Sequence, residues 1–117
     1  MRAEVKEFYS PDLDWQTEVP DGTACFGLLL QVFVGPAGED ASESFDLTVC
    51  TPSFMEGKVS EIGIVDGRHH LFVSCFDRNL IESYIRRRVE SIYGRDWNEV
   101  ALKVSRLGKW EFEDYSH

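Results

Sequence analysis

The sequence predicts an α+β fold, with one mainly antiparallel sheet of about five strands and helices packed on one face. Two observations carry this prediction. Segments with the apolar spacing of strands come first and segments with the spacing of helices dominate later, in the order βββαβααβ. The 117 residues also contain no linker, repeat or low-complexity tract, so we expect a single domain spanning 1–117.

The first three strands are predicted at 3–9, 25–34 and 44–50. The second is almost continuously apolar, which indicates burial on both faces and a central place in the sheet. The third alternates, so Asp46 and Thr48 should point to water while the other parity points inward: Phe45, Leu47 and Val49.

The first helix is predicted to begin after Thr51, with Pro52 at its first position, and to end at Gly63. Its inward stripe is expected at helical spacing: Met55, Val59 and Ile62. A turn at Asp66-Gly67 then leads to a fourth strand at 68–76.

Two further helices follow. Asp77 is predicted to cap the first of them, which Gly94 ends, and Asp96 to cap the other, which Gly108 ends. The apolar positions of the longer helix are Leu80, Ile81, Tyr84, Ile85, Val89, Ile92 and Tyr93. Those of the shorter helix are Trp97, Val100, Ala101, Val104 and Leu107.

The end of the chain is unusually aromatic for a terminus and predicts a last strand at 109–115. Strand alternation would bury Trp110 and Phe112. It would turn the other parity toward water: Glu111, Glu113 and Tyr115.

The net charge of −9 is concentrated in the first half of the chain. Residues 1–61 carry twelve acidic and three basic side chains, a net of −9, whereas 62–117 carry nine of each. This balance argues against binding nucleic acid or an anionic membrane through a basic patch. It suits a basic protein partner, and it equally suits a solubilising surface. No apolar run approaches the ~20 residues of a membrane span, and the first residues lack a signal-peptide core, so we expect a cytoplasmic protein.

The cysteines and histidines do not form a catalytic or metal-binding pattern. Cys25, Cys50 and Cys75 lie in or beside apolar strands and are predicted to be buried, reduced thiols. His69 and His70 point to opposite faces of a strand, so they cannot jointly hold a metal. His69 shares the parity of Cys75, but six strand residues span ~20 Å, too far for a nucleophilic pair. We therefore expect no enzymatic activity, cofactor or metal.

Two charged clusters lead to the same expectation. Arg86 and Arg87, of an arginine triplet, should be solvated or paired with Glu82 and Glu90. The acidic pairs in the loops lack the ligand spacing of a calcium site and are predicted to be solvated: Asp12 with Asp14, and Glu39 with Asp40.

Three short segments spread over the chain carry a family resemblance. They are Ser44-Phe45-Asp46 through Val49-Cys50-Thr51-Pro52, then Gly67-Arg68-His69, and Gly108-Lys109-Trp110-Glu111-Phe112. In this order they resemble the immunity protein 8 family of bacterial polymorphic toxin systems. The resemblance implies a small α+β protein that neutralises a secreted toxic domain, often a nuclease, by binding it.

We therefore expect a stoichiometric inhibitor of a basic toxin domain, with its oligomeric state left open. A non-catalytic structural or regulatory subunit of a bacterial assembly is the alternative, and a small enzyme a more distant one. The partner surface is expected on the open face of the sheet and its rim: Asp46, Thr48, Glu111, Glu113 and Tyr115. The acidic loops would extend it: Asp12, Asp14, Trp15, Glu39 and Asp40. Trp15 suits either an interface anchor or a plug for the core, and we favour the plug.

Overall fold

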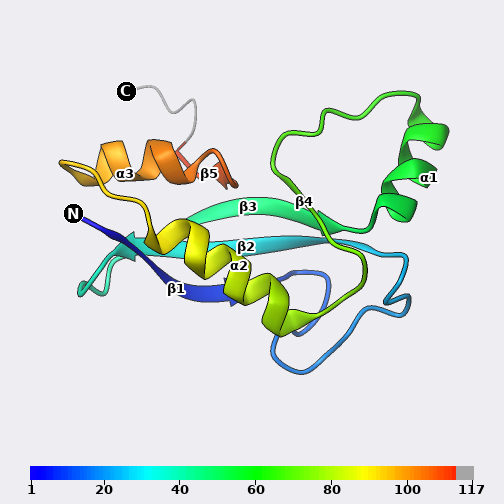
Figure 1. Cartoon of the computed structure of the whole chain (residues 1–117), viewed down its shortest axis with the longest axis horizontal. Helices are drawn as coiled ribbons and strands as arrows, with labels where there is room; N and C mark the ends of the chain where they lie inside the picture. Colours follow the sequence, from blue (N-terminus) through cyan, green and yellow to red (C-terminus); the bar gives the residue numbers. More distant parts are fainter. Residues whose placement is uncertain (113–117) are drawn as a thin grey trace.

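A computed structural model of the protein describes residues 1–112 and has the predicted α+β architecture. Five strands and three helices follow one another in the predicted order βββαβααβ (Figure 1). The strands are β1 (Ala3–Tyr9), β2 (Gly27–Pro36), β3 (Glu43–Cys50), β4 (His70–Phe72) and β5 (Lys109–Trp110). The helices are α1 (Pro52–Ile62), α2 (Arg78–Glu90) and α3 (Trp97–Val104).

The sheet is mixed but mainly antiparallel. Its order is β1–β2–β3–β4, and β5 also pairs with β3. The β3–β4 pair is parallel, because α1 carries the chain back to the same end of the sheet before β4 begins. β4 and β5 share one side of β3: β5 pairs with Phe45 and Asp46, and β4 pairs further along, from Thr48 to Cys50.

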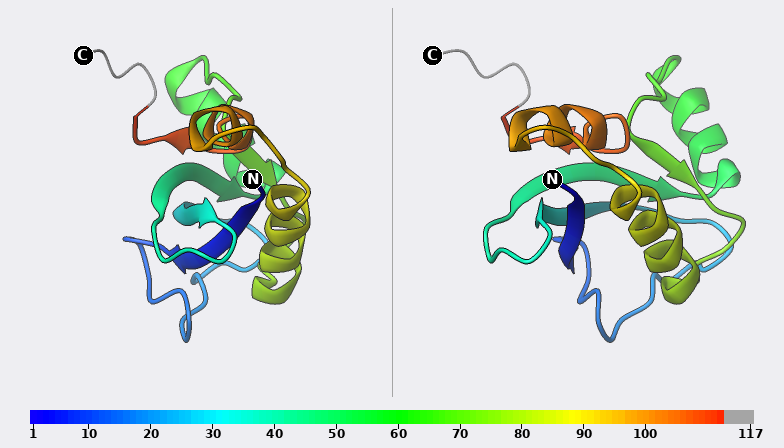
Figure 2. Two further views of the ribbon diagram at one scale, coloured as in Figure 1. Left: turned by 90° about the vertical axis from the view of Figure 1, so that its left-hand side faces the viewer. Right: turned by 60° about the vertical axis from the view of Figure 1, so that its left-hand side comes forward.

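The core lies between the sheet and the pair α2 and α3, which Figure 2 shows on the same side of the sheet. The inward residues of β2 and β3 are fully or almost fully buried, and β3 alternates as predicted. β2 has the predicted central place in the sheet, but the prediction that both its faces are buried was wrong, because its second face belongs to the side of the sheet that α2 and α3 leave uncovered. α2 contributes Ile81, Ile85 and Val89, and α3 contributes Val100, Ala101 and Val104. The prediction of helices on one face is thus confirmed for these two helices, while α1 stands apart at the end of the sheet (Figure 1).

The three predicted helix caps are confirmed. The side chains of Thr51, Asp77 and Asp96 each accept a hydrogen bond from a backbone N–H of the first turn, at 3.4, 3.1 and 2.9 Å. Gly63 ends α1 with a φ of 88°, which favours glycine. α2 ends at Glu90, before Gly94, because the next residues bond outside the helical pattern. The amide of Ile92 donates to the carbonyl of Val89, and the carbonyl of Ile92 accepts from the amide of Ala3 in β1. The amide of Gly94 donates to the carbonyl of Met1.

Two predicted strands are shorter than expected. β4 covers only His70–Phe72 of the predicted 68–76, because the chain leaves the sheet to reach the cap of α2 and the amide of Phe76 bonds to the carbonyl of Thr23. β5 covers only Lys109–Trp110, and Glu111 and Phe112 form a turn. Trp110 is half-buried and Phe112 is 39% exposed, so the prediction that both are buried was wrong for Phe112. The remainder of the predicted strand lies outside the described residues.

Several predicted core positions also prove to be exposed. Val59 and Ile62 of α1 are 41% and 55% exposed, and Leu80, Tyr84 and Tyr93 face water at the edges of the α2 stripe. Cys50 is buried, but Cys25 and Cys75 are exposed because they lie in loops beside the strands.

The close approach of the chain to β3 favours glycine at 108. A Cβ atom there would lie 3.1 Å from the backbone carbon of Phe45 and 3.2 Å from the carbonyl oxygen of Asp46. Gly108 therefore brings the end of the α3 segment directly onto β3, where β5 begins.

Candidate functional site

The sheet presents an open face on the side away from α2 and α3. Strand register places there Leu29, Gln31 and Phe33 of β2, and Ser44, Asp46 and Thr48 of β3. All six are half-buried, because neighbouring side chains of the pleat cover them in part. The predicted outward parity of Asp46 and Thr48 follows the burial pattern of β3.

Asp46 lies near the centre of this face, between Gln31 on one side and Lys109 on the other. Its Oδ2 accepts a 3.4 Å hydrogen bond from the Nε2 of Gln31. Its Oδ1 is buried and has no hydrogen-bond partner among residues 1–112. A buried carboxylate oxygen left in this way is costly.

Asp12 and Asp14 organise the acidic loop between β1 and β2. Asp12 accepts from the amide of Leu29 at 2.7 Å, while Ser10 donates to the carbonyl of Leu29 at 2.6 Å. These two side chains extend the pairing of β2 beyond the end of β1. Asp14 accepts from the amide of Gln16 at 3.0 Å, so both carboxylates shape the loop while remaining exposed.

Trp15 plugs the core, as favoured from the sequence. It is 3% exposed and lies between Phe8 and Phe76, at ring-centroid distances of 6.3 and 5.7 Å. Arg78 of α2 lies over its ring, at 5.7 Å from the centroid, and donates to its carbonyl. Trp15 is therefore inaccessible as an interface anchor.

An acidic hollow opens where β1 runs into this loop. It encloses about 520 Å³. Its lining includes Tyr9 and four carboxylates: Glu7, Asp12, Asp14 and Glu18. Within the part of the chain that the structure describes, no lysine or arginine lines it. Sequence reasoning missed Glu7, Tyr9 and Glu18. The sequence signal that could have found them is the spacing of the apolar residues Val5 and Phe8. Both are buried although they are three residues apart, which breaks strand alternation and marks the β-bulge that re-aims this end of β1.

The other predicted acidic loop lies at the opposite end of the sheet. Glu39 and Asp40 are exposed in the hairpin between β2 and β3, far from the loop of Asp12 in Figure 1. Nearby, one oxygen of Glu43 accepts hydrogen bonds from the indoles of both Trp97 and Trp110. The structure thus separates the predicted acidic residues into two groups, with Asp46 and Thr48 on the face between them.

Glu111 is exposed, as predicted, but it also closes the sheet. Its Oε1 accepts from the amide of Ser44 at 2.6 Å, and its own amide donates to the carbonyl of Ser44 at 3.1 Å. Glu113 and Tyr115 lie outside the described residues.

The basic side chains gather on the helical layer. Arg86 lies over the ring of Phe8 and Arg87 over the ring of Tyr84. Glu82 and Glu90, predicted as their partners, instead accept hydrogen bonds from the Trp15 indole and the Val5 amide. A second hollow of about 360 Å³ lies between α2 and α3, with three cations in its lining: Arg88, Lys103 and Arg106.

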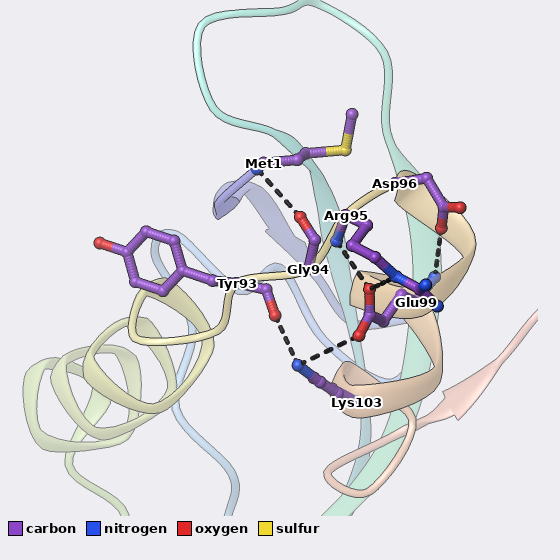
Figure 3. A network of polar contacts seen from close by, with 7 residues as sticks. All are labelled: Met1, Tyr93, Gly94, Arg95, Asp96, Glu99 and Lys103. Atoms are coloured by element: carbon purple, nitrogen blue, oxygen red, sulfur yellow. Dashed lines mark hydrogen bonds and ion pairs between the residues drawn. The ribbon is translucent and has the colours of Figure 1, made fainter.

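The segment that joins α2 to α3 is held by a polar network (Figure 3). The amino group of Met1 donates to the carbonyl of Gly94 at 3.0 Å, and Lys103 donates to the carbonyl of Tyr93 at 2.7 Å. Glu99 accepts from the backbone amide and the guanidinium of Arg95 at 2.7 and 3.2 Å. These bonds to Arg95, followed by the charges of Arg95 and Lys103, lower the pKa of the Glu99 carboxyl.

The histidines bond to backbone carbonyls. His69 approaches the carbonyl of Ser105 at 2.8 Å, and His70 that of Arg68 at 2.9 Å. Among residues 1–112, no group of three or more histidine, cysteine or acidic side chains is arranged to hold a metal ion. No helix in the same range is long and apolar enough to cross a membrane.

Comparison with known protein families gives a match that covers almost the whole chain. The profile of the family described as Immunity protein 8 matches residues 3–115. Comparisons with curated proteins and with solved structures give no match. Immunity proteins bind a cognate toxin and are generally non-catalytic. Because this profile spans almost the whole chain, the chain belongs to the immunity protein 8 family.

Proposed function

We propose that this immunity protein neutralises a basic toxin domain, a nuclease, by stoichiometric binding through its acidic surface in the cytoplasm. The observation that carries the proposal is the acidic hollow beside the open face, with Glu7, Asp12, Asp14 and Glu18 in its lining. A nuclease holds the phosphates of its substrate with lysine and arginine side chains. The same cations would bind these carboxylates, so inhibitor and nucleic acid would compete.

The distribution of charge supports a defined orientation of the complex. Residues 1–61 carry a net −9, whereas 77–107, which contain α2 and α3, carry seven basic and five acidic side chains, a net of +2. A basic partner would be attracted to the loops and the open face and repelled from the helical layer. Asp46 adds a half-buried carboxylate near the centre of that face.

Co-expression with the toxin domain encoded beside this gene tests the proposal. The inhibitor should abolish toxin activity with an end point at one inhibitor per toxin. The association rate should fall steeply with ionic strength, because surface charges steer the encounter. A toxin that remains active in the stable presence of this protein would contradict the proposal.

A matched pair of variants tests the role of the acidic hollow. Glu7→Gln and Ser83→Lys each add one unit of positive charge at an exposed position, the first in the hollow and the second on α2. Glu7→Gln should slow association several-fold more than Ser83→Lys does. Equal effects of the two variants would show that only the net charge matters.

A further inference from the structure

α1 is attached to the domain at one end and leaves its apolar stripe in water. All eleven residues of α1 are described, and none is buried. The attachment is through the buried Thr51 cap and through Phe54, whose ring lies so close to Gly27 that a Cβ atom there would come within 2.2 Å of it. An isolated helix of this length is marginal in water, so its exposed apolar face needs a reason.

The exposed residues form a continuous surface, which we call the α1 surface. It consists of the half-buried Met55 and the exposed Val59 and Ile62 at helical spacing, with Phe72 of β4 beside Met55 and Val59. Phe72 is 51% exposed, and with Met55 and Val59 it lines one hollow of about 380 Å³. Groups of apolar side chains such as this one are typically buried at the centre of a protein–protein interface.

The α1 surface is continuous with the open face of the sheet. Phe72 stacks on His70 at a ring-centroid distance of 6.3 Å. His70 is paired in the sheet with Thr48, which lies on the open face two residues from Asp46. One partner seated on Asp46 and Thr48 would therefore reach Phe72 and α1 without a gap.

The charges around the stripe favour a different protein over a second copy of this chain. Glu56 lies on one flank, and Lys58 and Glu61 lie on the other. In an antiparallel pair with Met55 opposite Ile62, each flank meets the same flank of the other helix, so Glu56 would share its flank with its own copy and Lys58 would lie near its own copy. Like charges would thus meet along the contact, which disfavours self-association. The rim carries a net −1 and continues the acidic half of the chain, so it complements a basic partner.

We propose that the α1 surface is the apolar part of the toxin-binding site, occupied by an apolar patch of the toxin bordered by basic residues. This inference rests on the proposed function and extends it. The acidic hollow and Asp46 would steer and orient the toxin, whereas Val59, Ile62 and Phe72 would hold it after contact. Charge would then set the association rate, and the α1 surface would set the dissociation rate.

The test compares two double variants that remove equivalent apolar area from exposed helix positions. Val59→Gln with Ile62→Gln changes the α1 surface. Leu80→Gln with Leu102→Gln changes positions on α2 and α3 that are 59% and 55% exposed. Glutamine keeps the helix propensity, so both variants should keep the circular dichroism spectrum and melting temperature of the wild type.

Toxin binding measured by surface plasmon resonance decides the outcome. The α1 variant should dissociate at least tenfold faster with little change in association rate, and the control should match the wild type. Wild-type dissociation rates in both variants would overturn the inference while leaving the proposed function intact. Failure of the wild-type protein to bind the toxin would contradict the proposed function itself.

Two measurements on the wild-type protein make the result independent of how the variants fold. Hydrogen exchange of the complex should show added protection at 52–62, and its absence there would overturn the inference. Light scattering should give a monomer for the free protein. A dimer that the α1 variant converts to a monomer, with toxin binding unchanged, would assign the surface to a second copy and overturn the inference.

Discussion

Glu82 of α2 accepts a 2.7 Å hydrogen bond from the indole nitrogen of Trp15, 67 residues earlier in the chain. This bond ties the acidic loop to the helical layer. Arg78, one turn before Glu82, holds the same loop by donating to the carbonyls of Trp15 and Glu18. The acidic hollow therefore rests on a buried aromatic residue that two charged side chains of α2 hold in place.

Replacing Glu82 should destabilise the protein through Trp15. Glu82→Leu leaves a buried indole N–H without its acceptor and should cost about 1–3 kcal/mol. Glu82→Gln keeps an acceptor oxygen and should cost less. Urea unfolding followed by tryptophan fluorescence measures both variants, and equal losses would show that the hydrogen bond is not the stabilising contact.

Two glycine substitutions should have opposite effects on stability. A Cβ at Gly57, inside α1, meets no atom within 4 Å, so Gly57→Ala should stabilise the protein by roughly 0.5–1 kcal/mol. Gly108→Ala should destabilise it, because the added carbon would lie 3.1 Å from the backbone of β3. Thermal unfolding should give a higher melting temperature for the first variant and a lower one for the second. A rise in both would mean that the crossing over β3 can relax.

The fold was predictable where local chemistry and burial agree. The caps at Thr51, Asp77 and Asp96 and the alternation of β3 depend on neighbouring residues alone, and all of them are confirmed. The stripe of α1 has the same helical periodicity as that of α2, so periodicity cannot reveal that one faces the core and the other faces water. The short length of β5 was also not predictable, because the alternation of residues does not show where the chain leaves the sheet. Trp110 stacks on Phe45 in parallel at 6.4 Å, and the chain turns immediately afterwards.

The candidate site was predictable in its chemistry but not in its geometry. Charge counting identified the acidic half of the chain, and parity identified Asp46 and Thr48. Only the structure places Glu7 beside Asp12 and Asp14, because the β-bulge in β1 re-aims Glu7 and the side-chain bond of Asp12 to β2 positions the loop. Glu111 was expected to be free for a partner, whereas its bond to the Ser44 amide gives it a structural role as well.

The Glu99 carboxylate should make stability depend on pH in the acid range. Its pKa in the folded protein is lowered from 4.5, first by the hydrogen bonds from Arg95 and then by nearby charge. A group with a lowered folded pKa stabilises the protein above its unfolded pKa and loses this effect as pH falls through the folded pKa. Wild type should therefore exceed Glu99→Gln in stability near neutral pH, and the difference should shrink as the pH falls below 4.5 and through the folded pKa. Urea unfolding from pH 7 to pH 3 measures this difference, and one that persists undiminished at pH 3 would assign it to a contact other than the charged form.

The exposed thiols should be dispensable for protection. Cys25→Ser and Cys75→Ser change exposed side chains in loops, away from the proposed binding surface. Each variant should protect against the toxin as fully as the wild type, because stoichiometric binding requires no nucleophile or acid–base pair. Loss of protection in a variant that still folds and still binds the toxin would instead indicate a chemical step.

Asp46 should contribute more to binding than to folding. Its Oδ1 is buried with no partner among residues 1–112, and its bond to Gln31 is long, at 3.4 Å. Asp46→Thr suits a strand and removes the unsatisfied oxygen, so the free energy of unfolding should be unchanged or should rise by up to about 1 kcal/mol. The same change should weaken toxin binding, because a basic toxin would lose a negative charge near the centre of the open face. Thr48→Val, on the same face two residues away, is the control and keeps the charge. Chemical unfolding and toxin-binding affinity should be measured on the same samples. A parallel loss of stability and affinity would make Asp46 a structural residue. An unchanged affinity would place the toxin away from the centre of the sheet.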